Sequence, residues 1–329
     1  MNSSAKTNVE AEAATFIKKP FFTHMILSGG GALGQVYPGV FRYLYQEGLH
    51  TSITTVAGTS VGAMVAIAFV LGHSMEQMKS YLTNMNEDLV SFDIMNALTI
   101  LDSMGLCDGE KMVERAKIDH VGNMTFLELA KKTGKNLIIC ATRVKTMTPI
   151  YFSVDNTPHV RVVDALQASM AIPLLVKPTK IGDELYIDGL VTHCIPIKAI
   201  PSHIPKENIL IVSLYSEKKD PESSQSQSTF TSDIGLPQLS KVGDFMSYVL
   251  NILNTIKQNH ESDYHLQSTY PYYLKLCNIP LKQFEMHIKD NKVALKIPTA
   301  ETADIAAAYG YEQIHEFMLN KIYKTPKYI

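Results

Sequence analysis

The stretch Ile53–Gly72, ITTVAGTSVGAMVAIAFVLG, decides the fold. Its first residues are β-branched or apolar, which is typical of a buried strand. Gly58–Gly62 follows as a tight turn, and Ala63–Leu71 continues as an apolar helix that stops at Gly72. Within the turn, Ser60 stands in a G-x-S-x-G pattern. Between a strand and a helix, this pattern is typical of a nucleophile elbow. An ordinary strand-to-helix turn is the alternative.

A second glycine-rich turn lies upstream, after a short strand expected over His24–Ser28. The adjacent Gly29, Gly30 and Gly31 leave backbone N–H groups unobstructed, so they are candidates for an oxyanion hole. A phosphate-binding loop is an alternative, because the pattern also fits G-x-G-x-x-G when Gly34 is included. A dinucleotide fold, however, would close its second strand with an acidic residue, where this chain has the serine turn. A turn without a ligand is the third possibility.

The alternation of strands, turns and helices from residue 24 to residue 72 predicts right-handed βαβ units and a mainly parallel central sheet. Capping boxes are expected at Ser74 with Gln77 and at Thr125 with Glu128. Asp108 is a candidate cap between them, so residues 74–134 are expected to be mostly helical. Further helices are expected over 35–47, 162–171, 239–257 and 299–323, and further strands over 136–143, 149–154, 185–187, 209–215 and 272–277.

Four regions of the chain differ in composition and pattern. Residues 1–20 are polar and predict a flexible N-terminal tail. Residues 21–215 carry the α/β pattern and are expected to form the catalytic core. Residues 216–237 are rich in Ser, Gln, Asp and Pro, which indicates a flexible loop. Residues 238–329 are expected to form a mainly helical C-terminal extension packed on the core.

Composition excludes several classes of function. The 329 residues carry a net charge of −2, which offers no electrostatic footprint for nucleic acid. The 4 cysteines form no C-x-x-C pair, so they are interpreted as free thiols, and neither a metal nor a cofactor is expected. The N-terminus lacks the pattern of a signal peptide, and no apolar run is long enough to span a membrane. A cytoplasmic protein in peripheral contact with membranes is expected, or one delivered by a route that needs no classical signal peptide.

Asp188 follows an expected strand and precedes Gly189, so its carboxylate can approach another segment of the chain closely. A surface Asp-Gly turn is the alternative. Histidine must also be considered as the base, because α/β-hydrolases order their triad as Ser, acid, His. None of the histidines after Asp188 stands in a recognisable motif; they are His193, His203, His260, His265, His287 and His315.

Taken together and in order, four motifs resemble the patatin-like phospholipase family. They are the glycine run Gly29–Gly34, the serine turn Gly58–Gly62, the stretch Ala168–Pro173 with Lys177-Pro178 after it, and Asp188-Gly189. The resemblance covers about residues 24–200. It implies a three-layer α/β/α fold with a mainly parallel sheet and a Ser–Asp dyad without histidine.

Carried over by motif, Ser60 is the nucleophile and Asp188 its base, while the amides of Gly30 and Gly31, together with Gly29, hold the oxyanion. The resemblance implies a calcium-independent lipid acyl hydrolase of phospholipase A or lysophospholipase type, which acts through an acyl-enzyme on membrane or micellar lipid. A dry acyl pocket would raise the pKa of the aspartate and make it a better base. Alternatives are a non-catalytic lipid-binding protein on the same fold and a hydrolase of neutral lipids or small esters. The sequence does not indicate the oligomeric state.

Two positions depart from the family pattern. Leu33 stands in the glycine loop where plant-type members carry Arg, which puts the preference for a lipid head group in doubt. Leu190 follows Asp188-Gly189 where many relatives have Gly or Ala. A bulkier residue there is expected to be tolerated, although it could reshape the turn that holds Asp188.

Overall fold

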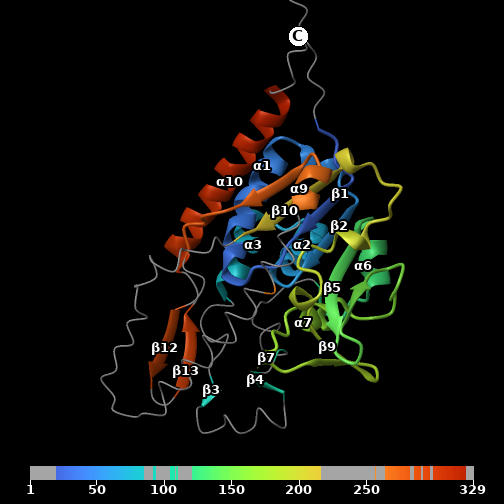
Figure 1. Ribbon diagram of the computed structural model, residues 1–329, viewed down its shortest axis with the longest axis vertical. Helices are drawn as coiled ribbons and strands as arrows, with labels where there is room; N and C mark the ends of the chain where they lie inside the picture. Colours follow the sequence, from blue (N-terminus) through green and yellow to red (C-terminus); the bar gives the residue numbers. More distant parts are fainter. Residues whose placement is uncertain are drawn as a thin grey trace, which may run out of the picture.

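The computed structural model describes residues 20–84, 92–93, 104–107, 109, 121–215, 256, 264–281, 285–289, 292–296 and 299–323 (Figure 1). The expected loop over 216–237 lies outside these residues. So do residues 1–19 of the expected tail, the candidate cap Asp108, and all of the helix expected over 239–257 except Ile256.

A mixed eight-stranded sheet forms the centre of the molecule. Its order is β11-β10-β1-β2-β5-β9-β8, and β6 pairs with β5. The strands from β11 to β5 run parallel, whereas β6, β8 and β9 run antiparallel to their neighbours. The bounds are β1 His24–Leu27, β2 Thr55–Thr59, β5 Asn136–Arg143, β6 Thr148–Phe152, β8 Thr179–Ile181, β9 Glu184–Asp188, β10 Ile209–Leu214 and β11 Tyr273–Leu276.

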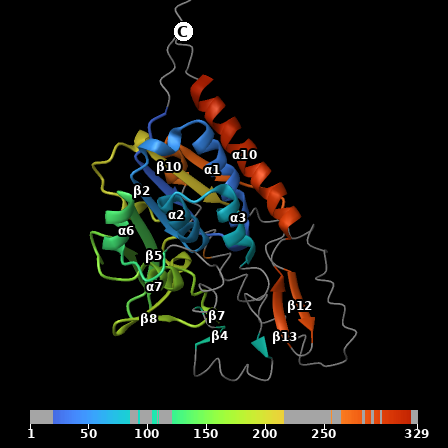
Figure 2. The same ribbon diagram turned by 180° about the vertical axis from the view of Figure 1, so that it is seen from behind.

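Helices cover both faces of this sheet, which confirms the expected three-layer α/β/α fold (Figures 1 and 2). On β1, Met25 and Leu27 join the large core cluster with the helices of one face. Ile26 points the other way and packs with Leu266 and Ile195. The first face carries α1 Tyr37–Gln46, α2 Val61–Leu71, α3 Met75–Asn84, α6 Phe126–Thr133, α7 Val162–Ser169 and α10 Ala300–Tyr323, and the second carries α9 Tyr264–Thr269 and the 3₁₀ turn η5 Ile197–Ala199.

Several elements differ from their expected form. The helix after the glycine run starts as a 3₁₀ helix, η1 Gly31–Val36, which leads directly into α1. The region expected to be mostly helical contains two short strands, β3 Phe92–Asp93 and β4 Gly105–Cys107. The cause is pairing with distant segments: β4 pairs with β7 Leu174–Val176, and β3 pairs with β13 Lys292–Lys296. Both expected capping boxes are confirmed at Ser74 with Gln77 and at Thr125 with Glu128.

The C-terminal extension contributes strands as well as helices. β11 adds to the main sheet beside β10, while β12 Glu285–Lys289 and β13 Lys292–Lys296 form an antiparallel pair. The remaining 3₁₀ turns are η2 Leu49–Ser52, η4 Gly189–Val191 and η6 Lys206–Asn208. No helix among the described residues is both long and apolar enough to cross a membrane.

The long helix α10 packs with its backbone directly against α1 and η1 (Figure 2). A Cβ added to Gly39 would lie 1.7 Å from the carbonyl oxygen of Ala307, and one added to Gly310 would lie 2.2 Å from that of Val36. Only glycine permits approaches this close. The C-terminal helix is therefore fitted to the element that carries the glycine loop.

Candidate active site

Ser60 occupies a strained turn between β2 and α2. Its backbone angles are φ 55° and ψ −125°, a region that non-glycine residues rarely adopt. A Cβ on Gly58 would lie 2.4 Å from the carbonyl oxygen of Gly62, and one on Gly62 would lie 2.4 Å from that of Leu27. The two glycines of the G-x-S-x-G pattern are therefore needed because backbone passes directly beside them. This is the geometry of a nucleophile elbow.

The sheet brings Asp188 to this turn from the opposite direction. β2 runs along one edge of β5 and ends where Thr59 pairs with Cys140. β6 occupies the other edge of β5. The antiparallel β9 shares the edge with β2 and ends where Asp188 pairs with Ala141, the residue after Cys140. The ends of β2 and β9 therefore meet along β5, and the residues at both ends face each other.

A direct hydrogen bond joins the two predicted catalytic residues. Ser60 Oγ donates to Asp188 Oδ2 over 2.8 Å, and the Leu190 N–H donates to Asp188 Oδ1 over 2.7 Å. Both side chains are buried, with Ser60 7% and Asp188 1% exposed. A Cβ on Gly189 would lie 2.5 Å from the Cys140 carbonyl oxygen, so the Asp-Gly pair is required by a close approach to β5.

No imidazole of the described residues stands between these two side chains, which contact each other directly. His193 is the histidine nearest to Asp188 in the sequence, and its Nδ1 is hydrogen-bonded to the hydroxyl of Tyr151. Its carbonyl oxygen accepts a bond of 3.0 Å from Thr59 Oγ1. The backbone of His193 thus supports the elbow, while the aspartate contacts the serine itself. The geometry matches a Ser–Asp dyad.

Burial makes Asp188 a stronger base than an ordinary aspartate. Removal from water raises the pKa of its carboxyl group to about 7, against the lowering effect of the hydrogen bonds from Leu190 and Ser60. Desolvation has this effect because it disfavours the charged form. A general base is most effective when its pKa lies near the working pH, so the environment suits proton transfer from a hydroxyl group.

The glycine loop lies directly against Ser60, the predicted nucleophile. A Cβ on Gly29 would be only 3.3 Å from the Cβ of Ser60. The Gly29 N–H already donates to the carbonyl oxygen of Cys194 over 3.2 Å. Within the described residues, the amides of Gly30 and Gly31 have no acceptor, and Gly31 adopts a φ of 55° at the start of η1. Two of the three predicted donors are therefore free to bind an oxyanion.

Hydrogen bonds from two other elements fix this loop. The Tyr37 hydroxyl donates to the Ser28 carbonyl oxygen over 2.7 Å, and Tyr37 is completely buried at the start of α1. The Leu214 N–H at the end of β10 donates to Ser28 Oγ over 2.8 Å. Because the loop is held in this way, its free amides are preorganised, which is what oxyanion stabilisation requires.

A patatin-like phospholipase family model matches residues 25–200, which is more than half of the chain. The chain belongs to the patatin-like phospholipase family. Among its relatives, the probable lipid hydrolase 463L of Invertebrate iridescent virus 6 is 26% identical over 58% of this chain and 68% of its own. The uncharacterized protein R571 of Acanthamoeba polyphaga mimivirus is 26% identical over 60% of this chain and 67% of its own.

Triacylglycerol lipase 5 of Saccharomyces cerevisiae is 27% identical over 46% of this chain. The matched region makes up 21% of that lipase. Among solved structures, VipD from Legionella pneumophila has a similar fold, with a TM-score of 0.53 and 17% identity over 91% of this chain and 67% of its own. The likeness to VipD shows a shared fold alone.

The two departures from the family pattern are accommodated without disturbing the dyad. Leu33 is 3% exposed and belongs to the large core cluster, so its side chain faces the interior. Leu190 is half-buried in η4, and its N–H still donates to Asp188. In this patatin-like chain, a residue larger than glycine after Asp188-Gly189 therefore leaves the carboxylate in place.

Sequence reasoning missed two hydroxyl groups that contact the dyad. Ser169 Oγ accepts the Ser60 N–H over 2.8 Å, and Thr142 Oγ1 donates to the Asp188 carbonyl oxygen over 3.0 Å. Ser169 lies in the Ala168–Pro173 stretch that carries part of the family resemblance, which was the available signal. Among the described residues no group of three or more His, Cys, Asp or Glu side chains could hold a metal ion.

Proposed function

We propose that this protein is a calcium-independent lipid acyl hydrolase of phospholipase A or lysophospholipase type, with Ser60 as nucleophile and Asp188 as base. One observation carries the proposal: the buried Ser60 hydroxyl donates directly to the raised-pKa carboxylate of Asp188. The site lies beside the free amides of Gly30 and Gly31. Family membership and the lipid hydrolases among its relatives favour a lipid ester over other acyl substrates. The substrate would be presented in a membrane or micelle.

The reaction would proceed by two acyl transfers. Ser60 Oγ attacks the ester carbonyl carbon while its proton passes to Asp188 Oδ2. The N–H groups of Gly30 and Gly31 would stabilise the oxyanion. When the tetrahedral intermediate collapses, the bond to the leaving alcohol breaks and Asp188 returns its proton to that oxygen. A water molecule then attacks the acyl-enzyme, again giving a proton to Asp188, and the fatty acid leaves as Ser60 regains that proton.

Incubation with a mixed panel of phospholipids, lysophospholipids and triacylglycerols tests this function. We expect free fatty acid by mass spectrometry in the presence of a calcium chelator, with phospholipid or lysophospholipid consumed fastest. Preferential loss of triacylglycerol would instead indicate a neutral-lipid hydrolase. Lipid binding without release of fatty acid from any member of the panel would contradict hydrolysis and favour a lipid-binding protein.

The pH profile of hydrolysis should follow the ionisation of Asp188. Only its carboxylate form can accept the Ser60 proton, and burial raises the pKa of that group to about 7. We therefore expect kcat/KM to rise about tenfold per pH unit below this value and to level off above it, because kcat/KM reports the free enzyme. Measurements from pH 5 to pH 9 with a soluble ester check this, and a flat profile below pH 7 would contradict the role of Asp188.

A further inference from the structure

We propose that Ser169 is a positioning residue that fixes the backbone of the nucleophile and thereby sets the contact between Ser60 and Asp188. Ser169 ends helix α7, far from the elbow in sequence. The inference rests on the proposed hydrolase function and adds a residue whose role neither motif nor family match assigns.

A relay of two hydrogen bonds runs from the elbow through Ser169 to the sheet. The Ser60 N–H donates to Ser169 Oγ over 2.8 Å, and Ser169 Oγ donates in turn to the Cys140 carbonyl oxygen over 2.6 Å. Ser169 is 0% exposed. The hydroxyl is therefore shielded from water, accepts with one side, donates with the other, and ties α7, β5 and the elbow together.

The Ser60 amide needs this acceptor because of where it lies. Ser60 is the N-cap residue of helix α2, and the first N–H groups of a helix have no partner within that helix. A buried N–H without an acceptor is unfavourable, because it has lost its hydrogen bonds to water and gained none in return. A strained backbone such as that of Ser60 persists only where its surroundings hold it in several ways. The Ser169 hydroxyl supplies one such restraint on the residue that bears the nucleophilic oxygen.

The same short segment also holds the base. The Asp188 N–H donates to the Ala171 carbonyl oxygen over 2.9 Å. Residues 169–171 therefore contact the backbone of both members of the dyad, the nucleophile through a side chain and the base through a carbonyl group. Movement of this segment would change the separation between Ser60 Oγ and Asp188 Oδ2.

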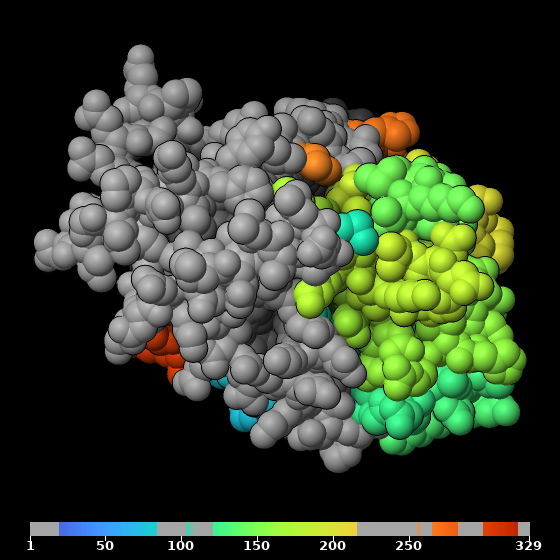
Figure 3. Space-filling model, turned by 90° about the horizontal axis from the view of Figure 1, so that it is seen from below, coloured from blue at the N-terminus to red at the C-terminus, as the bar shows by residue number. Residues whose placement is uncertain are grey.

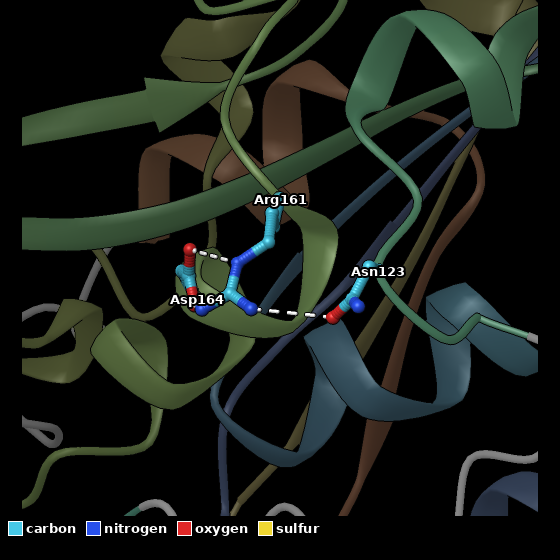
Figure 4. Close-up of polar contacts among 3 residues, drawn as sticks. All are labelled: Asn123, Arg161 and Asp164. Atoms are coloured by element: carbon cyan, nitrogen blue, oxygen red, sulfur yellow. Dashed lines mark hydrogen bonds and ion pairs between the residues drawn. The ribbon is translucent and has the colours of Figure 1, made fainter.

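The other end of α7 is anchored as well (Figure 4). Arg161, just before the helix, forms a two-point contact with Asp164 through Nε and Nη2, over 2.8 and 2.5 Å. Its Nη1 donates to Asn123 Oδ1 over 3.2 Å, and the Val162 N–H donates to the Met124 carbonyl oxygen over 2.9 Å. The ion pair lies within the first turn of α7, whereas the bonds to Asn123 and Met124 tie that turn to another segment of the chain. Both ends of α7 are therefore held, which restrains the position of Ser169.

This role makes a prediction that a purely structural role does not. The hydrogen bond from Ser60 lowers the pKa of Asp188 against the effect of burial. If Ser169→Ala lets the Ser60 backbone relax, that bond weakens and the pKa of the base rises further. The midpoint of the pH profile should then move to higher pH, together with a fall in kcat and little change in KM.

The test compares Ser169→Ala, Ser169→Thr and the control Ser213→Ala, each checked for its folded fraction by thermal unfolding. Ser213 matches Ser169 because it is also 0% exposed, while its Oγ has no hydrogen-bond partner within the described structure. For Ser169→Ala we expect kcat to fall at least about tenfold and the profile midpoint to rise, with partial recovery in Ser169→Thr, which keeps the hydroxyl. Ser213→Ala should match wild type.

Unchanged kcat in folded Ser169→Ala would overturn the inference, as would a lower kcat with the wild-type midpoint or a midpoint shift shared by Ser213→Ala. If Ser169→Ala is folded too little to assay, Ser169→Thr must show a lower kcat and a midpoint above that of wild type, with unchanged KM; a fall in stability with the wild-type midpoint overturns the inference. Absence of Ser60-dependent hydrolysis in wild type is a separate result, because it rejects the proposed function itself.

Discussion

Ser60→Ala is expected to lower the rate of fatty-acid release by at least about 10⁴-fold, because removal of a serine nucleophile leaves only transition-state binding by the rest of the site. Ser60 Oγ is the atom that donates to Asp188, and no other hydroxyl group in the described structure donates to that carboxylate. Labelling by a fluorophosphonate probe should disappear in the same variant, since the probe forms its covalent bond with the same oxygen.

The variant should remain folded. Alanine removes the hydroxyl without adding atoms to a buried turn, and the Ser60 N–H keeps its bond to Ser169. Ser213→Ala removes the hydroxyl of a buried serine whose Oγ has no hydrogen-bond partner in the described structure, so it should keep both activity and labelling and controls for the substitution itself. Equal labelling of wild type and Ser60→Ala would show that another residue is the nucleophile.

Asp188→Asn should remove activity to a similar extent, at least about 10³-fold, and at the same time stabilise the protein. An amide cannot take the Ser60 proton. It can, however, keep both contacts: its oxygen can accept from the Leu190 N–H, and its nitrogen can donate to Ser60 Oγ. Loss of activity would then report lost proton transfer in a site that is otherwise intact.

The stability gain has a defined dependence on pH. Burial raises the pKa of Asp188 to about 7 from 3.8, so the folded protein holds its proton more tightly than the unfolded chain. The free energy of unfolding of wild type therefore falls as pH rises from about 4 to about 7, and the loss is complete above the folded pKa. Asparagine carries no such cost, so its advantage should grow by about 3 kcal/mol between pH 5 and pH 8.

Urea unfolding of wild type and Asp188→Asn at these two pH values measures the effect. A constant difference between the proteins would show that Asp188 does not titrate in this range. An advantage that shrinks with rising pH would mean that the carboxylate is stabilised in the folded state, which contradicts the role of burial. Retained activity in Asp188→Asn would point to a histidine as base.

The local geometry of the nucleophile and the glycine loop could be predicted from the sequence. Each motif is contiguous, and each glycine is required by a contact within a few residues or with the adjacent strand, as the close approach of Gly62 to Leu27 shows. The partnership of Ser60 with Asp188 was supplied by family resemblance. Its physical basis is that β2 and β9 both pair with β5 and end next to each other. The pattern of apolar residues within one strand does not indicate which distant strand pairs with it.

Other features depend on contacts that no local pattern records. The Gly29 N–H donates to the carbonyl oxygen of Cys194, which is distant in the sequence. The three glycines therefore look equally available as oxyanion donors until the fold is known. Ser169 lies in a stretch that carries part of the family resemblance, but its contact with the Ser60 amide joins residues far apart in the sequence. The short strand β4 exists because β7 pairs with it, and neither strand has enough residues to show an alternation of its own.

The close packing of α10 against η1 determines how long a fragment must be if the site is to be moved into another protein. The family match ends at residue 200, yet β10 supplies the Leu214 amide that holds Ser28, and Gly310 of α10 lies against the Val36 carbonyl group. A fragment cut at the end of the match would keep Ser60 and Asp188 but would lose these two contacts, which support the glycine loop. A fragment for a graft or a domain exchange should therefore extend beyond Gly310, more than a hundred residues past the end of the family match.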